Sequence, residues 1–198
     1  MNQMPTLQTA RLIIRPFEMV DLPQAHHLFD SEISDADLRV DKQKTLAERA
    51  TWLQWTVLNY HQLAKLHQPP YGDRAIILKT SGDLIGACGY VPCLDAFYLL
   101  PNFDQSGGST LVKRNTTELG LFYAIARAYR KQGYATEAAL ALIEYAFQTL
   151  DLVRVVATTE YTNAGSISVM QKLGMRVEKN PHPQPPWLQV VGVLENTI

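Results

Sequence analysis

One basic stretch of the chain, residues 130–137, has residue types and spacing suited to holding an anion. It reads Arg-Lys-Gln-Gly-Tyr-Ala-Thr-Glu and joins an apolar run to a helical pattern. The first N–H groups of a helix lack intrahelical partners and lie at the positive end of the helix dipole. Gly133 permits a tight bend or a close approach to a ligand, and Arg130 and Lys131 add positive charge. The stretch predicts a phosphate site, most readily for a diphosphate; the alternative is an ordinary strand-to-helix turn with a solvated basic pair.

The elements on either side of this turn follow from apolar spacing. The run before it is apolar from Leu119 to Ala128 apart from Gly120 and Arg127, which predicts a strand at 118–126. After the turn, apolar residues recur at intervals of three or four and form one face of a helix that runs to about Leu150. The turn contains neither the Walker pattern nor the dinucleotide fingerprint G-x-G-x-x-G.

The order of motifs resembles a known family. Arg130-x-x-Gly133-x-Ala135 matches the Q/R-x-x-G-x-G/A acyl-CoA signature of the GNAT N-acetyltransferases. Further matches extend it on both sides, and together they resemble the branch that contains the ribosomal-protein N-acetyltransferases. These matches are Glu118-Leu-Gly120, Tyr134-Ala-Thr-Glu137, Asn163-x-x-Ser166 and Lys172-Leu-Gly-Met175. The resemblance covers Leu7 to Val177 and is poorer from Pro92 to Thr117.

The resemblance implies transfer of an acetyl group from acetyl-CoA to a primary amine, by direct attack in a ternary complex. The amine would belong to a small molecule or to a protein N-terminus. By the family pattern, the backbone at the end of the strand binds the pantetheine arm and the turn amides bind the diphosphate. The implied cofactor-binding residues are Tyr123, Ala124, Ile125, Ala126, Arg130, Lys131, Gln132, Gly133, Tyr134, Ala135, Thr136 and Asn163.

Three catalytic residues follow from the same resemblance. An ammonium acceptor must lose a proton, and Glu118 is the first candidate base, with Glu160 as the second. In the ribosomal-protein branch a serine in N-x-x-S fits the acid that protonates the leaving thiolate, which here is Ser166, with Tyr161 as a rival. The competing interpretation is structural: Glu118 is a solvated carboxylate, and Asn163 caps a helix by accepting from the Ser166 amide.

The order of helices and strands predicts an α/β fold with a mixed sheet, in a single domain over residues 1–198. The resemblance implies that this sheet is GNAT-like, mainly antiparallel and flanked by helices. Helices are expected after Asp21 as N-cap, over 45–66, and from Asn163 to Leu173 with Gly174 beyond. The first strand is predicted at Leu7–Phe17, ended by Pro16. Five more strands complete the sheet, at 74–79, 84–91, 153–158, 175–178 and 188–194. Pro92 is expected to end the strand at 84–91, and the strand at 188–194 is expected to close the sheet.

Residues 92–117 form an insertion relative to the usual short connection of the family. Loops of this length are uncommon in compact domains and are often functional. The segment is interpreted as a lid or wall of the acceptor pocket, a contact in a possible homodimer, or a decorated hairpin. An acidic cluster, Asp30, Glu32, Asp35 and Asp37, follows the first helix and favours a cationic acceptor, although such a run is more often a solvated loop.

Composition limits the other classes of function. Of 198 residues, 46% are apolar and 19% are charged, with a net charge of −1, so a nucleic-acid or membrane partner is not expected. The absence of a long apolar run or a signal peptide, and two cysteines without metal-ligand spacing, favour a cytoplasmic protein without a bound metal. The alternative to an enzyme is a non-catalytic acyl-CoA-binding or sensor module.

Overall fold

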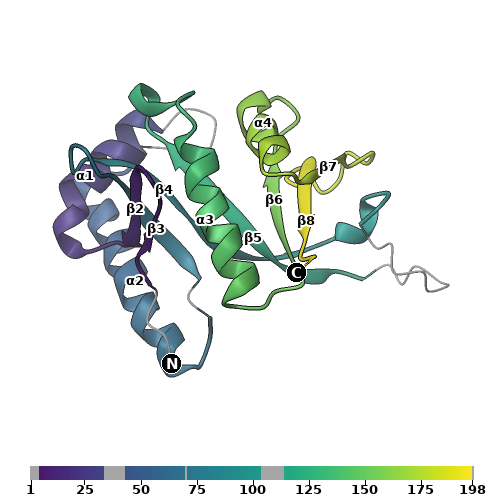
Figure 1. Cartoon of the computed structure of the whole chain (residues 1–198), viewed down its shortest axis with the longest axis horizontal. Coiled ribbons are helices and arrows are strands. Elements are labelled where there is room, and N and C mark those ends of the chain that lie inside the picture. The colour runs from purple at the N-terminus through teal and green to yellow at the C-terminus, as the bar shows by residue number, and fades with distance from the viewer. Residues whose placement is uncertain (1–4, 34–42, 70, 104–113, 198) are drawn as a thin grey trace. The chain divides into compact units, whose positions relative to one another are not determined.

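The structure is a computed structural model that describes residues 5–33, 43–69, 71–103 and 114–197. The chain divides into two compact units. The first comprises Met1–Tyr90 and Phe122–Leu142, and the second comprises Val91–Leu121 and Ile143–Ile198. Three elements therefore contribute residues to both units (Figure 1). They are β4 (Leu84–Asp95), β5 (Thr116–Ile125) and α3 (Tyr134–Gln148).

The other helices and strands belong to one unit each. The first unit holds β1 (Leu7–Gln8), β2 (Leu12–Pro16), α1 (Leu22–His27), α2 (Leu46–Lys65) and β3 (Gly72–Leu78). The second holds β6 (Arg154–Thr159), α4 (Ala164–Lys172), β7 (Arg176–Lys179) and β8 (Val190–Glu195). The α/β class with a mixed, mainly antiparallel sheet is confirmed, since β5–β6 is the one parallel pair among the strand pairs described. The single-domain expectation stays a prediction.

The sheet of the first unit has the strand order β1-β2-β3-β4-β5 and is covered on both faces. Side chains of α1 and α2, among them Ala25 and Leu53, pack with Ala75 of β3 and Ala87 of β4 in one buried cluster. Successive side chains of a strand point to opposite faces, so Tyr90 faces away from this cluster. Its hydroxyl donates a hydrogen bond to the carbonyl of Leu142 in α3. The strands of the first unit are therefore buried between α1–α2 and α3.

The predicted first strand, Leu7–Phe17, is wrong as one continuous element. It consists of β1 and β2, which pair antiparallel with Leu7 opposite Ile14. Thr9 makes the reversal, because its hydroxyl accepts from the Leu12 amide at 2.9 Å and its own amide donates to the Leu12 carbonyl. The apolar pattern predicted extended backbone correctly but carried no signal for the turn inside it.

Two expectations about the first helices also change. Asp21 precedes α1 as predicted, but its carboxylate caps no helix amide of α1; it binds the Arg15 guanidinium through two contacts of 2.7 Å. The apolar spacing over 45–66 predicts Leu46 and Leu58 on the buried face of the second helix. In α2, which begins with a capping box at Thr45, both are half exposed. The buried face is rotated toward Arg49, Leu53, Thr56 and Leu63 because α2 buries a charged side chain.

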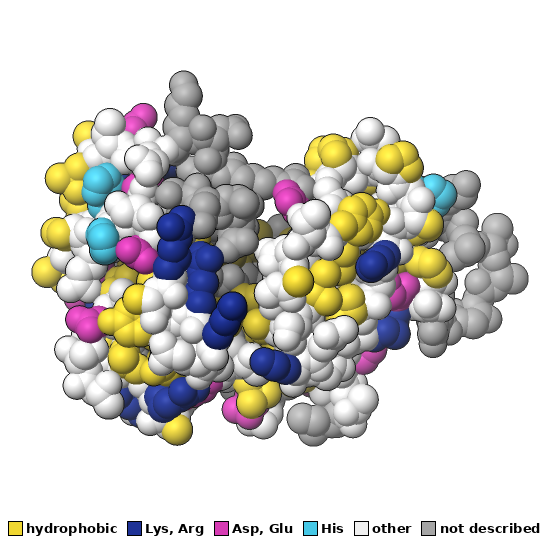
Figure 2. All heavy atoms as spheres, turned by 90° about the horizontal axis from the view of Figure 1, so that it is seen from above, with side chains coloured by type: hydrophobic (Ala, Val, Ile, Leu, Met, Phe, Trp, Pro, Cys, Tyr) yellow, Lys and Arg dark blue, Asp and Glu magenta, His cyan; other side chains and the backbone are white. Residues whose placement is uncertain are grey.

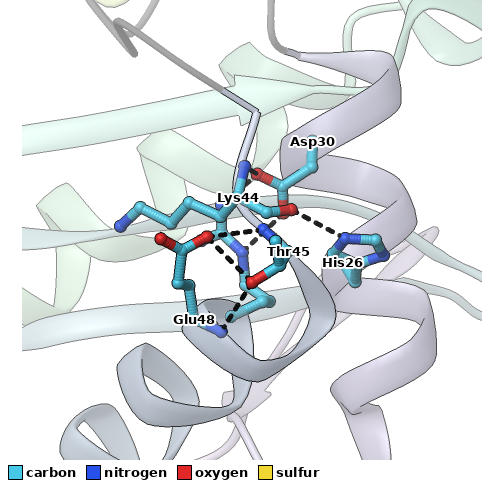
Figure 3. A network of polar contacts seen from close by, with 6 residues as sticks. His26, Asp30, Lys44, Thr45 and Glu48 are labelled. Atoms are coloured by element: carbon cyan, nitrogen blue, oxygen red, sulfur yellow. Dashed lines mark hydrogen bonds and ion pairs between the residues drawn. The ribbon is translucent and has the colours of Figure 1, made fainter.

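That buried charge belongs to an ion pair that joins α2 to the π-helical segment Leu28–Glu32, which follows α1. Arg49 and Asp30 are 4% and 3% exposed and form two hydrogen bonds of 2.8 Å. The guanidinium lies over the rings of Phe29 and Trp52 at 4.7 and 4.9 Å. Asp30 also accepts from the Lys44 amide at 2.8 Å (Figure 3). Asp30 was expected in a surface acidic cluster for a cationic acceptor, and this is wrong because its charge is already neutralised inside the unit.

In the second unit, β8 lies between β6 and β7 and pairs antiparallel with both. The last strand therefore takes an inner position rather than the closing edge that the sequence order suggested. One face of this sheet receives α4: a Cβ on Gly192 would come within 3.1 Å of Met170. The neighbouring residues Val191 and Val193 point to the other face.

The described part of the insertion covers that other face. Phe97, Leu100 and Phe103 are buried in one cluster with Val156, Leu188, Val191 and Val193. The rings of Phe97 and Phe103 stack at a centroid distance of 4.8 Å. The strand before them, β4, continues through Pro92 to Asp95 instead of ending there. This part of the insertion is a hydrophobic cover of the sheet, while residues 104–113 lie outside the described part of the chain.

One carboxylate of the first unit is expected to make stability depend on pH. Burial raises the pKa of Asp73, on β3, to about 6. Between pH 4 and 6 the folded state then binds more protons than the unfolded state, so stability falls as the pH rises through this window. We expect Asp73→Asn to raise the free energy of unfolding at pH 7.5 by about 1–3 kcal/mol, from 1.36 kcal/mol per pKa unit, and to leave it unchanged near pH 4. Thermal unfolding of both proteins across pH 4–8 measures this, and an equal difference at both ends would contradict it.

Candidate active site

The predicted strand, basic turn and helix are confirmed around residues 125–137. β5 ends at Ile125, a single 3-10 turn spans Arg127–Tyr129, and α3 begins at Tyr134. Lys131 and Gly133 both have left-handed backbone, with φ of 60° and 85°. These two residues reverse the chain so that the helix starts directly after the turn. A residue without a Cβ adopts such backbone at the least cost, which explains the glycine.

The first amide groups of α3 have no intrahelical acceptors. The Glu137 amide donates to the Gly133 carbonyl at 3.0 Å and closes the first turn of the helix. The amides of Tyr134, Ala135 and Thr136 come before that bond and have no intrahelical acceptor. With the positive end of the dipole of a 15-residue helix, they favour an anion.

Positive side chains accompany these amides. Arg127, Lys131 and the backbone of Gly133 are exposed, whereas Arg130 is half buried and its Nε donates to the Ile125 carbonyl at 2.9 Å. Arg130 therefore fixes the turn to the end of β5 rather than reaching freely into solvent. Lys and Arg side chains also gather visibly on the face seen from above (Figure 2).

The end of β5 provides the backbone expected for a pantetheine arm. Tyr123 is half buried, and Ala124, Ile125 and Ala126 are buried. The Ala126 amide donates to the Ile85 carbonyl at 2.9 Å, which holds this end to β4. Earlier in the same strand, Gly120 pairs with Val156 of β6 in parallel register.

Glu118, the first candidate base, is held in an ion pair of the second unit. It is 8% exposed and both carboxylate oxygens bind the Arg154 guanidinium, at 2.8 and 2.7 Å. Thr116 donates a third hydrogen bond at 3.1 Å, and the guanidinium stacks over the Phe103 ring at 4.4 Å. Glu118 is thus not a solvated carboxylate, and it can accept a proton only if this pair opens.

The residues after β6 surround the start of α4 in the same unit. Asn163 accepts the Ser166 amide at 2.9 Å through its side-chain oxygen, so the predicted helix cap is confirmed. Glu160 and Ser166 are half buried. The hydroxyl of Tyr161 donates to the Asn180 carbonyl at 2.6 Å, so in this state its proton is engaged.

The candidate residues thus fall into two groups, each placed within its own unit. The first unit contains Tyr123 to Ala126 and residues 130–136, and the second contains Glu118, Glu160, Asn163 and Ser166. In the part of the chain that the structure describes, three or more His, Cys, Asp and Glu side chains do not come together as a metal site. None of the described helices is both long and apolar enough to cross a membrane.

One functional candidate, Arg11, was missed because the signal lies far from the turn in sequence. It follows β1 and contacts residues 132–137 of the turn and helix. In the sequence, the only signal for this role of Arg11 was the pattern Thr9-x-Arg11, in which two polar residues interrupt an apolar stretch.

Comparison with known sequences matches most of the chain to one family. Residues 11–176 match the model of the Acetyltransferase (GNAT) domain. The uncharacterized protein YkkB of Bacillus subtilis (strain 168) is 28% identical over 183 residues, which is 90% of this chain and 90% of that protein. The matched family covers β2 to the first residue of β7, including the turn at 130–137.

Solved structures confirm the fold. An acetyltransferase from Agrobacterium tumefaciens str. C58 aligns with a TM-score of 0.68 and 24% identity, over 98% of this chain and 96% of that one. RimL, a ribosomal L7/L12 alpha-N-protein acetyltransferase in complex with coenzyme A, aligns with a TM-score of 0.62 and 14% identity, over 96% of each chain. At these identities the likeness establishes the shared fold.

Proposed function

The chain belongs to the GNAT acetyltransferase family and is an acyltransferase, and we propose that it transfers an acetyl group from acetyl-CoA to a primary amine in a ternary complex. The observation that carries the proposal is the start of α3. There a positive-φ glycine, unpaired helix amides and exposed Arg127 and Lys131 meet at the end of a buried strand. This donor set suits a diphosphate.

Binding of the cosubstrate is assigned to the first unit. The amides of residues 131–136 would hold the diphosphate, and the backbone of Tyr123 to Ala126 would hold the pantetheine arm. Backbone N–H groups of β5 also suit the developing negative charge on the thioester oxygen. Asn163, whose side-chain oxygen caps α4, would add a contact to the pantetheine arm. Acetyl-CoA supplies the acetyl group as a thioester, whose C–S bond breaks as the new C–N bond forms.

Proton transfers are assigned to the second unit. Glu118, after release from Arg154, or Glu160 would take a proton from the acceptor ammonium, directly or through water, and the neutral amine would then attack the thioester. Ser166 would protonate the leaving thiolate and regain its own proton from solvent. RimL acts on a ribosomal protein, and the acceptor proposed here is an amine of that kind, a peptide N-terminus, or a small-molecule amine. The predicted homodimer and cytoplasmic location stay predictions.

A second candidate function is a non-catalytic acyl-CoA-binding or sensor module. The observation in its favour is that two groups suited to proton transfer are engaged in structural contacts. The Glu118 carboxylate is bound to Arg154, and the Tyr161 hydroxyl donates to Asn180.

Calorimetric titration with acetyl-CoA, followed by a thiol-release assay over a panel of amines and peptide N-termini, separates these functions. We expect binding, and release of free thiol that depends on one class of amine. Binding without release over the whole panel would favour the sensor module. Absence of binding would overturn both functions.

Within the enzyme, Ser166→Ala is expected to lower kcat by about 100-fold, the usual contribution of a positioned acid or base. The Kd for acetyl-CoA should stay within about twofold, because the helix cap uses the backbone amide of Ser166, which alanine retains. Ser168→Ala, on the same helix, is the matched control and should keep the activity of the parent protein. Steady-state kinetics over pH 6–9 measure the effect, and an unchanged kcat would remove Ser166 from the reaction.

A further inference from the structure

We infer that Arg11 is a positioning residue that presets the anion-binding turn for the diphosphate of acetyl-CoA. The inference rests on the proposed function, since it concerns the same turn. Arg11 lies between β1 and β2, and its guanidinium makes three different contacts with one short segment. It donates to the Gln132 carbonyl at 3.0 Å and to the Glu137 carboxylate at 2.6 Å, and it lies over the Tyr134 ring at 4.3 Å. We call these contacts the Arg11 clamp.

The bond to Gln132 controls the direction of the Gly133 amide, which is one of those assigned to the diphosphate. A trans peptide is planar, so the carbonyl of Gln132 and the N–H of Gly133 point in opposite directions. Because Arg11 holds the carbonyl, the Gly133 N–H is turned away from Arg11. The guanidinium also lies close to Gly133 itself, since a Cβ built on Gly133 would lie 3.4 Å from Arg11 Nη2. Gly133 and its neighbour Lys131 have left-handed backbone, and without such a contact this turn has many alternative conformations.

The bond to Glu137 removes an unfavourable charge from the same place. A carboxylate in the first turn of α3 stabilises the helix by its interaction with the helix dipole, but it would repel a phosphate. Its oxygens accept from the Arg11 guanidinium, from the Arg11 amide at 2.9 Å and from the Thr9 hydroxyl. Burial alone raises the pKa of Glu137, but these hydrogen bonds lower it overall, so the group stays ionised and paired. The clamp thus keeps the helix start rigid while cancelling its negative charge.

The geometry separates positioning from simple charge attraction. Arg11 and Glu137 form a neutral pair, so the pair adds little net attraction for an anion. The guanidinium donates to two acceptors at once and stacks on a ring, which the ammonium of lysine does not reproduce. The Arg11 side chain is 45% exposed, and ion pairs this exposed contribute little to stability. Its loss should therefore disturb the turn and the affinity for acetyl-CoA more than the folding of the unit.

The experiment compares Arg11→Ala and Arg11→Lys with Lys65→Ala, a control that removes one positive charge from the exposed surface of α2. In the ligand-free proteins, hydrogen exchange of the segment 127–137 should be faster by about tenfold or more in Arg11→Ala, and unchanged in the control. The Kd and KM for acetyl-CoA should rise by about tenfold, with kcat at saturation within about threefold. The melting temperature should fall by no more than about 4 °C. Arg11→Lys should recover only a minor part of the affinity.

Each contrary result overturns the inference. Unchanged exchange in Arg11→Ala would show that the clamp does not order the turn. Faster exchange with unchanged affinity would show that this order does not matter for binding. Full recovery by Arg11→Lys would replace positioning with charge. The exchange measurement needs no ligand, so it decides the positioning role even if the parent protein fails to bind acetyl-CoA, a result that would overturn the proposed function instead.

Discussion

Gly133→Glu is expected to weaken acetyl-CoA binding by about 100-fold or more while the protein stays folded. A carboxylate at this point lies among the amides assigned to the diphosphate, and repulsion of two charges a few ångströms apart near a surface amounts to about 3 kcal/mol or more. The new side chain also competes for Arg11, which would lie 3.4 Å from its Cβ. Titration of both proteins with acetyl-CoA measures the change. Parent affinity in a folded variant would contradict the diphosphate assignment.

A matched control separates the effect of position 133 from the general effect of replacing a glycine by glutamate. Gly174 follows α4, has φ of 77°, and has no atom within 4 Å of a built Cβ, so Gly174→Glu introduces the same charge and the same backbone strain elsewhere. A non-glycine residue in left-handed backbone costs roughly 1–2 kcal/mol, so both variants should lose similar stability. The affinity for acetyl-CoA should fall in Gly133→Glu alone. An equal fall in both would indicate a general effect of strain or charge.

Asp30→Ala is expected to reduce the free energy of unfolding by about 3–5 kcal/mol, the usual effect of breaking a buried ion pair. Arg49 would keep its charge at 4% exposure without its partner, and the start of α2 would lose the bond from the Lys44 amide to Asp30. For a chain of this length the melting temperature should fall by about 6–20 °C. Chemical denaturation measures the change. A loss below about 1 kcal/mol, as for an exposed pair, would contradict the structural role.

The double variant Asp30→Leu with Arg49→Met tests whether the loss of stability comes from the unpaired charge of Arg49. Replacing both charges by apolar side chains of similar volume should recover most of the stability, because no buried charge is left unpaired.

The stability lost in the single variant Asp30→Ala should also depend on pH. Burial raises the pKa of Asp30, but hydrogen bonds from Arg49 and Lys44 lower it overall. The stabilisation from the pair is therefore present above the ordinary aspartate range and is lost as the pH falls through the lower folded pKa, so the deficit should shrink below about pH 4.

Local features of this protein were determined by the sequence alone. The turn at 130–137 and the cap of α4 by Asn163, with Gly174 beyond it, were both predicted from short spacing and found in the structure. In each case the interacting groups lie within about four residues, so the pattern itself contains both partners. The family and the strand-to-helix site follow from the same short motifs.

The tertiary structure alone decided which distant groups meet. The partner of Glu118 is Arg154, 36 residues away, and that of Glu137 is Arg11, 126 residues away. The buried pair of Asp30 and Arg49, the place of β8 between β6 and β7, and the cover formed by Phe97 and Phe103 are of the same kind. Residue types give the charge and apolar surface of each partner, but the pairing depends on the path of the chain between them. Local spacing does not contain that path, because it is set by how the strands assemble and which faces they must bury.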